Sequence, residues 1–288
     1  MLKEWPLVAF TILGQTAVGV FLVFHLPFIV RGRLPGSGWR LTWIVTLAIV
    51  VLITAASAFA SFFHLRHPLR ARRALSNLRT SWLSREILFE LAFGGLVVLE
   101  GWLAYVKPAS RASLWPAIGA AALAGMFFVI SMARLYMLPS LPAWRGAYTP
   151  LSFFLTTLVL GALGTEIIVR AFAGPEAFDL NLTATALLLI AAEILLAVVL
   201  APRHGLRGVR PGPSLRPKDD APRRFHGARI VLLALGSVGL ALDLATGGND
   251  IVNEKGIGPA LLLAFVFALA GEVAGRFHFY GLVARPGE

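Results

Sequence analysis

Ionisable side chains from four distant segments of this 288-residue chain are predicted to meet at one edge of a membrane. His64 ends one apolar run, and Glu86 and Glu90, four residues apart on one helical face, open the next. Arg134 and Tyr136 end a later run. The final run closes with Glu272, Arg276, His278 and Tyr280. Because a charged side chain inside a membrane span is costly, each of these groups calls for a partner or a function.

Such a set of side chains suits the binding of a quinone. The quinone ring is apolar and is reached from the lipid, each carbonyl requires a hydrogen-bond donor, and the two-electron redox change moves two protons. Histidine suits this proton transfer because it titrates near neutral pH, and a neighbouring carboxylate can orient it and relay the proton to water. We therefore expect His64 to donate to one carbonyl, Glu86 or Glu90 to pass protons, and Arg134 or Tyr136 to support the second carbonyl.

Haem is the competing interpretation of the histidines. Two facing histidines can hold a b-type haem, and His25, His64 and His278 lie in or beside apolar runs. His25 has no visible partner at its depth, and no second histidine pair completes an electron path across the membrane. We expect no haem and no metal in this chain.

Other ionisable residues in the runs allow simpler explanations. Glu272 and Arg276 are spaced to neutralise each other within one helix. Arg170 and Arg276 are close enough to the ends of their runs to reach the polar headgroups. A further group either forms a proton path or packs helices, and the spacing does not decide between these roles: Glu100, Glu166, Glu193 and Asp243.

The composition requires these side chains to be positioned by membrane helices. The chain is 57% hydrophobic and 14% charged, with a mean hydropathy of +0.76, whereas soluble chains have roughly 45–50% apolar and about 25% charged residues. Continuous apolar runs of bilayer length predict an all-α integral membrane protein, a bundle of eight transmembrane helices in a single domain, 1–288. The runs cover about 6–30, 41–63, 86–106, 116–138, 149–173, 182–201, 230–246 and 259–281, of which the seventh is short.

The absence of cysteine excludes disulfides, thiolate zinc sites, covalently attached c-type haem and iron–sulfur clusters held by this chain. The net charge of +11 is typical of cytoplasmic loops against anionic lipid rather than of nucleic-acid binding. With eight spans both termini share one side, which we call side A. Basic residues concentrate in two side A connections, 64–85 and 202–229, so the positive-inside rule places side A in the cytoplasm.

Segment 61–86, SFFHLRHPLRARRALSNLRTSWLSRE, resembles the most recognisable stretch of a known family. It is similar to the membrane anchor subunit of dimethyl sulfoxide reductase, within the wider polysulfide-reductase-type anchors, which include sulfite dehydrogenase anchors. Three further stretches extend the resemblance over nearly the whole chain: EWPLVAFTILGQ (4–15), ARLY with WRGAYTPLSFFLT (133–136 and 144–156), and AGEVAGRFHFYG (270–281).

The resemblance implies an eight-helix subunit without haem that exchanges electrons with ubiquinone or menaquinone in the bacterial inner membrane. Its partners would be a four-cluster iron–sulfur subunit and a molybdenum bis-pterin catalytic subunit. The family's quinone-site histidine falls on His64 and its acidic position on Glu86. Arg66 replaces the family's usual glycine and His67 is an additional histidine, which leaves open the choice of working histidine.

The direction of electron flow follows from orientation in this family. Members that oxidise quinol usually work with exported catalytic subunits, whereas sulfite-oxidising members keep these subunits in the cytoplasm. A cytoplasmic side A therefore favours sulfite-dehydrogenase-like quinone reduction. The alternative from another class is a proton-coupled secondary transporter, which predicts discontinuous helices and inverted repeats; the sequence shows neither.

Overall fold

The structure is a computed structural model that describes residues 4–34, 36–63, 77–106, 111–137, 144, 146–173, 181–200, 221–246 and 257–282. These residues form eight long helices, a short 3-10 turn, η2 (Ser37–Trp39), and no strand. The long helices are α1 (Trp5–Arg31), α2 (Arg40–Phe62), α4 (Trp82–Val106), α5 (Arg111–Tyr136), α6 (Tyr148–Phe172), α7 (Leu182–Val199), α9 (Ala221–Ala245) and α10 (Pro259–Gly281). Each is long and apolar enough to cross a membrane, so the predicted fold class is confirmed.

Three helices begin earlier than the apolar runs indicate. α4 begins at Trp82 rather than 86, α5 at Arg111 rather than 116, and α9 at Ala221 rather than 230. All three extensions contain charged residues, which lower the local hydropathy without breaking the helix. The apolar run of the seventh span is therefore shorter than its helix, because the first turns carry arginines, Arg229 among them.

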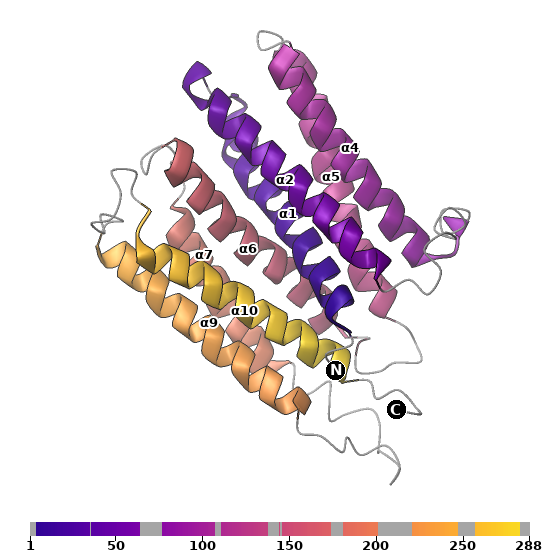
Figure 1. Cartoon of the computed structure of the whole chain (residues 1–288), viewed down its shortest axis with the longest axis vertical. Coiled ribbons are helices and arrows are strands. Elements are labelled where there is room, and N and C mark those ends of the chain that lie inside the picture. The colour runs from indigo at the N-terminus through magenta and orange to yellow at the C-terminus, as the bar shows by residue number, and fades with distance from the viewer. Residues whose placement is uncertain are drawn as a thin grey trace.

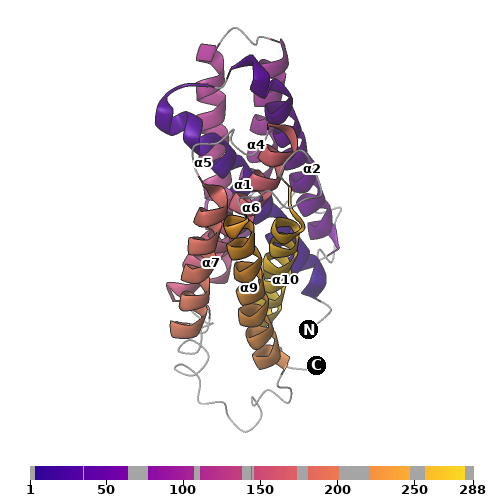
Figure 2. The same cartoon turned by 90° about the vertical axis from the view of Figure 1, so that its left-hand side faces the viewer.

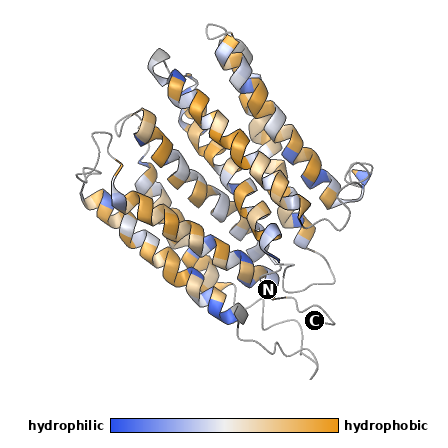
Figure 3. Cartoon of the chain, viewed as in Figure 1, coloured by the Kyte–Doolittle hydropathy of each residue, from blue (hydrophilic) through white to orange (hydrophobic). Residues whose placement is uncertain are grey.

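The helices lie side by side, with the beginning of α1 and the end of α10 at the same end of the bundle, side A (Figure 1). The opposite end is side B. The turned view shows the same side-by-side arrangement from the face formed by α7 and α9 (Figure 2). α1 and α6 are the most enclosed helices, with 78% and 72% of their apolar windows buried. Apolar residues cover most of each helix, whereas hydrophilic residues gather at the beginning of α9 (Figure 3).

Glycines let the two central helices meet backbone to backbone. A Cβ atom on Gly19 of α1 would lie 1.9 Å from the carbonyl oxygen of Thr157 on α6. A Cβ atom on Gly161 of α6 would lie 2.4 Å from the carbonyl carbon of Gly19. Small residues at helix contacts allow this close approach in membranes, where van der Waals packing drives association. The contact between α1 and α6 is thus the central seam of the bundle.

Candidate functional site

The inward face of α4 carries three glutamates. From Glu86 on, its buried residues repeat at intervals of four and three, which places them on one stripe of the helix: Glu86, Glu90, Phe93, Val97 and Glu100. Ser84 is also buried. Glu86 and Glu90 are 2% and 5% exposed, although α4 is a peripheral helix with only 22% of its apolar window buried. Both carboxylates therefore point into the bundle near side A, as the sequence predicts.

Glu90 and Glu86 differ in their hydrogen bonding. The Ser57 hydroxyl of α2 lies 2.9 Å from Glu90 Oε1 and 3.1 Å from the Phe10 carbonyl oxygen of α1. Glu86 Oε1 is buried and has no hydrogen-bond partner among the residues that the structure describes. A buried carboxylate oxygen without a protein partner calls for another donor, such as water or a ligand. Glu90 is thus anchored, whereas Glu86 offers a free acceptor.

Two tyrosines face each other beside Glu86. The hydroxyls of Tyr136 on α5 and Tyr280 on α10 are 3.3 Å apart, and the Tyr280 hydroxyl is also 3.4 Å from Thr11 Oγ1 on α1. Glu86 interacts electrostatically with both phenols. The rings of Tyr136 and Phe279 meet edge to face, 5.5 Å apart. Carboxylate, hydroxyl and aromatic groups from α4, α5 and α10 therefore converge near side A.

Four further predicted site residues are an arginine and three histidines. Arg134 is exposed whereas Tyr136 is buried, so the two side chains lie on different faces of α5, and the role of Arg134 at a quinone carbonyl stays a prediction. His278 is buried but lies against His226 of α9, with ring centroids 4.8 Å apart. His64 and His67 lie outside the described residues, so their roles stay predictions.

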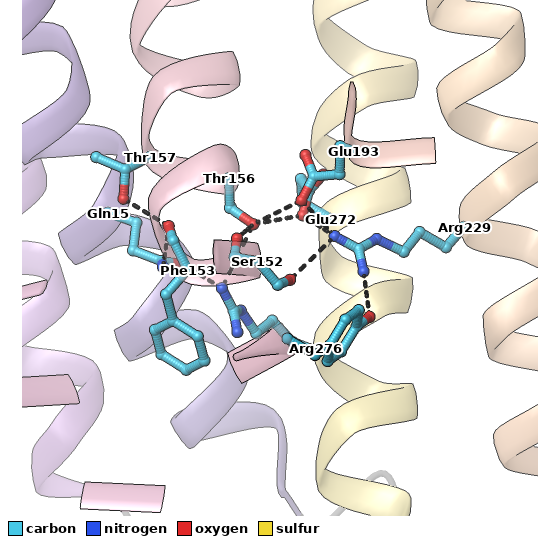
Figure 4. Close-up of polar contacts among 10 residues, drawn as sticks. Gln15, Ser152, Phe153, Thr156, Thr157, Glu193, Arg229, Glu272 and Arg276 are labelled. Carbon is cyan, nitrogen blue, oxygen red and sulfur yellow. Dashed lines mark hydrogen bonds and ion pairs between the residues drawn. The ribbon is translucent and has the colours of Figure 1, made fainter. Parts of the chain in front are cut away.

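Arg276 connects this site with the interior. Its Nη2 donates to Gln15 Oε1 of α1 at 2.9 Å, and Gln15 Nε2 donates to the Phe153 carbonyl oxygen of α6 at 2.9 Å (Figure 4). The Arg276 guanidinium also lies over the Phe153 ring, 3.6 Å from its centroid. Arg276 is 3% exposed. The expectation that this arginine reaches the headgroups is therefore wrong.

Glu272 is bound by an arginine from another helix. Arg229 of α9 donates to Glu272 Oε2 at 3.1 Å and also contacts Glu193 of α7. The Thr156 hydroxyl lies 2.7 Å from Glu272 Oε2 (Figure 4). Since Arg276 turns to Gln15, the ion pair expected within α10 is replaced by a pair between α9 and α10. Arg229, expected in a basic side A connection, is instead 2% exposed inside the bundle.

Two further polar contacts lie toward side B. His25 Nε2 is 2.8 Å from Glu100 Oε1, and His25 Nδ1 is 2.8 Å from the Phe21 carbonyl oxygen. His25 therefore pairs with Glu100, a contact that the residue pattern did not predict, and both of its ring nitrogens are engaged. Arg170 pairs with Glu166 at 2.7 Å and Asp243 at 2.8 Å, so it does not extend to the headgroups either.

Sequence reasoning missed several members of the network, including Gln15 and the pairing of Arg229 with Glu193. The signal that could have revealed Gln15 is its depth in the membrane. Gln15 is an amide in the middle of a strongly apolar run, and such a residue requires a hydrogen-bond partner in lipid. The identity of the partner depends on helix packing, which the residue pattern does not reveal.

One known protein family matches nearly the whole length of this sequence. The family model of the DMSO reductase anchor subunit (DmsC) matches residues 1–282. The chain belongs to the DMSO reductase anchor subunit family. With eight helices able to cross a membrane, this member is a multi-pass membrane anchor subunit.

Individual relatives agree with this assignment to the DmsC family. The sequence is 32% identical over 293 residues to a chain of the anaerobic dimethyl sulfoxide reductase of Escherichia coli (strain K12), covering 97% of this protein and 94% of the relative. It is 30% identical to the anaerobic dimethyl sulfoxide reductase protein YnfH of the same organism, with the same coverage. A sulfite dehydrogenase subunit of Allochromatium vinosum is 29% identical over 136 residues, 43% of this protein and 41% of the relative. No solved structure matches the sequence.

Proposed function

We propose that this DmsC-family subunit binds ubiquinone or menaquinone at side A and exchanges electrons with an iron–sulfur subunit docked there. The observation that carries the proposal is the convergence of Glu86, Tyr136 and Tyr280. These residues come from three helices, are all buried, and include a carboxylate oxygen without a protein partner in the described chain.

The donor set fits the chemistry of a quinone. When bound, the quinone or quinol supplies a two-electron redox change coupled to two protons. The Tyr136 and Tyr280 hydroxyls can donate to a carbonyl oxygen, and Glu86 can accept or return a proton. Glu90, held by Ser57, keeps a second carboxylate beside Glu86. His64 directly follows the last described residue after α2, and α2 ends at side A together with the beginning of α4.

The partners follow from family membership. We propose that side A docks a four-cluster iron–sulfur subunit, which in turn holds a molybdenum bis-pterin catalytic subunit. Exposed arginines at this end, Arg79, Arg223 and Arg224, can contact an acidic partner surface or anionic lipid. Family membership favours a bacterial inner membrane, and the basic side A connections favour side A in the cytoplasm. In this orientation the complex reduces quinone as a sulfite-dehydrogenase-like enzyme; the reverse direction is dimethyl-sulfoxide-reductase-like quinol oxidation.

The experiment is quinone-linked turnover of the purified complex, with its iron and molybdenum contents measured as a test of assembly. Glu86→Gln removes the proton acceptor and keeps the side-chain size. General acid–base groups contribute roughly 10²–10⁴-fold to rate, so we expect a loss of this order with unchanged metal content. Glu166→Gln, a buried carboxylate near side B, is the matched control and should retain turnover. Full turnover in Glu86→Gln, or a wild-type complex without iron and molybdenum, would refute the proposal.

A further inference from the structure

Two glutamates meet deep inside the second half of the bundle, away from the Glu86 site. Glu193 of α7 and Glu272 of α10 both contact the same nitrogen, Nη2 of Arg229. The Thr156 hydroxyl of α6 also lies between them, 3.3 Å from Glu193 Oε1 and 2.7 Å from Glu272 Oε2. Both carboxylates are at most 1% exposed. Sharing two hydrogen-bond partners brings their oxygens side by side (Figure 4).

A pair of neighbouring carboxylates is suited to share a proton. Two negative charges so close together repel strongly in an interior of low dielectric, and one shared proton removes this repulsion. The groups that face the pair are Arg229 from α9, Arg276 from α10 and Tyr148 from α6, whose hydroxyl lies 3.0 Å from Arg229 Nη1. With both carboxylates ionised, the two arginines make the cluster neutral, and uptake of one shared proton raises its net charge to +1.

Four polar atoms of this cluster are buried and lack a hydrogen-bond partner within the described part of the chain. They are two acceptors and two donors: Glu193 Oε2, Glu272 Oε1, Arg229 Nε and Arg276 Nε. Water molecules that accept from a guanidinium and donate to a carboxylate match this set, since internal waters usually bind polar groups left over by the protein. The cluster therefore keeps hydrogen-bonding capacity that the packing of its helices leaves unused.

Arg276 stands between this cluster and the tyrosines of the quinone site. It interacts electrostatically with Glu193, Glu272 and, one turn further along α10, Tyr280. Tyr280 in turn contacts Tyr136. A change of charge at either end therefore acts on the other through a single buried guanidinium.

We propose that Glu193 and Glu272 form a proton-holding pair that serves the quinone site, an inference that rests on the proposed function. Oxidation of one quinol releases two electrons and two protons. The electrons pass to the iron–sulfur partner, one proton leaves toward side A through Glu86, and the carboxylate pair takes up the other. In quinone reduction the pair returns this proton.

The test is an infrared difference spectrum of the complete wild-type complex with and without quinol. A change in the C=O stretch of a protonated carboxylic acid is expected, shifted in ²H₂O. It should disappear in Glu193→Gln and Glu272→Gln and persist in the matched control Glu166→Gln, whose carboxylate pairs with Arg170. Turnover should fall roughly 10- to 100-fold in both pair variants, at or below the lower end of direct acid–base effects because the pair acts at a distance.

Several outcomes would overturn the inference. One is that the wild-type complex shows no carboxyl signal. Another is that both pair variants keep the wild-type signal and the wild-type turnover. If these variants do not assemble, Thr156→Val removes the shared hydroxyl and should shift the signal; an unshifted signal overturns the inference. Reduction of the iron–sulfur clusters by quinol separates the two proposals. If quinol does not reduce the clusters in the wild type, the proposed function fails. If quinol reduces them but the carboxyl signal is the same in the wild type and in both pair variants, only the proton pair fails.

Discussion

His25 on α1 and Glu100 on α4 bind each other at 2.8 Å, at the end of the bundle opposite to Glu86. His25 Nδ1 faces the Phe21 carbonyl oxygen, which can only accept, so Nδ1 carries a hydrogen. The contact between Nε2 and Glu100 therefore needs one more proton, held by either partner. With at most 1% exposure on both sides, this pair ties α4 to the centre of the bundle.

Removing one partner of this pair should destabilise the protein strongly. His25→Leu or Glu100→Leu leaves the other group buried and unpaired, and we expect a loss of about 3–5 kcal/mol. The double variant leaves no uncompensated group and should regain most of the loss. Thermal unfolding of the four proteins in detergent measures this cycle. A double variant no more stable than the single ones would show that the pair does not act as a unit.

The glycine seam should be intolerant of a methyl group. Gly19→Ala places a carbon 1.9 Å from the Thr157 carbonyl oxygen. Overpacking costs about 1–3 kcal/mol in ordinary cores, and here backbone atoms would have to separate. Gly119→Ala on α5, where a Cβ meets nothing within 4 Å, is the control and should be neutral or stabilising. Equal melting temperatures for the two variants would argue against a tight seam.

Tyr136 and Arg134 should differ in their effect on quinone affinity. Tyr136→Phe removes a buried hydroxyl that reaches Tyr280, and the loss of one hydrogen bond should weaken quinone binding about 3- to 10-fold. Arg134→Ala changes an exposed side chain and should leave the affinity unchanged. The KM for a soluble quinol analogue compares them. A larger effect from Arg134→Ala would place the site elsewhere.

Arg229 should be indispensable for folding, unlike its neighbours on α9. Arg229→Met removes the cation from two buried carboxylates and should cost about 3–5 kcal/mol. The exposed Arg224 gives the comparison, since Arg224→Met should change stability by no more than about 0.5 kcal/mol. The melting temperature of the isolated subunit in detergent measures both effects, apart from any contact of Arg224 with a partner. Similar behaviour of the two variants would contradict the buried role of Arg229.

The sequence was sufficient for the fold because each span has to be continuously apolar. The sequence-based prediction was wrong at the first turns of α9. Arginine is common in loops, so Arg229 was assigned to a connection, whereas it forms an ion pair inside the bundle. Such an arginine is distinguishable only through its partners, Glu193 and Glu272, which lie 36 and 43 residues away.

Helical spacing predicted part of the site and could have corrected the rest. Glu86 and Glu90 share a face because they are four apart, and the same holds for Glu272, Arg276 and Tyr280. Residues two apart point to opposite faces of a helix. This geometry separates the exposed Arg134 from Tyr136 and turns His278 toward His226.

The contact of Gly19 with Gly161 has a mechanical consequence. Two helices whose main chains interlock cannot slide or rock past each other without separating the bundle, and the hydrogen bond from Gln15 Nε2 to the Phe153 carbonyl oxygen holds the same α1–α6 boundary. Transporters that alternate between two openings depend on such motion. A stiff scaffold instead suits electron tunnelling, whose rate depends steeply on the gap between donor and acceptor.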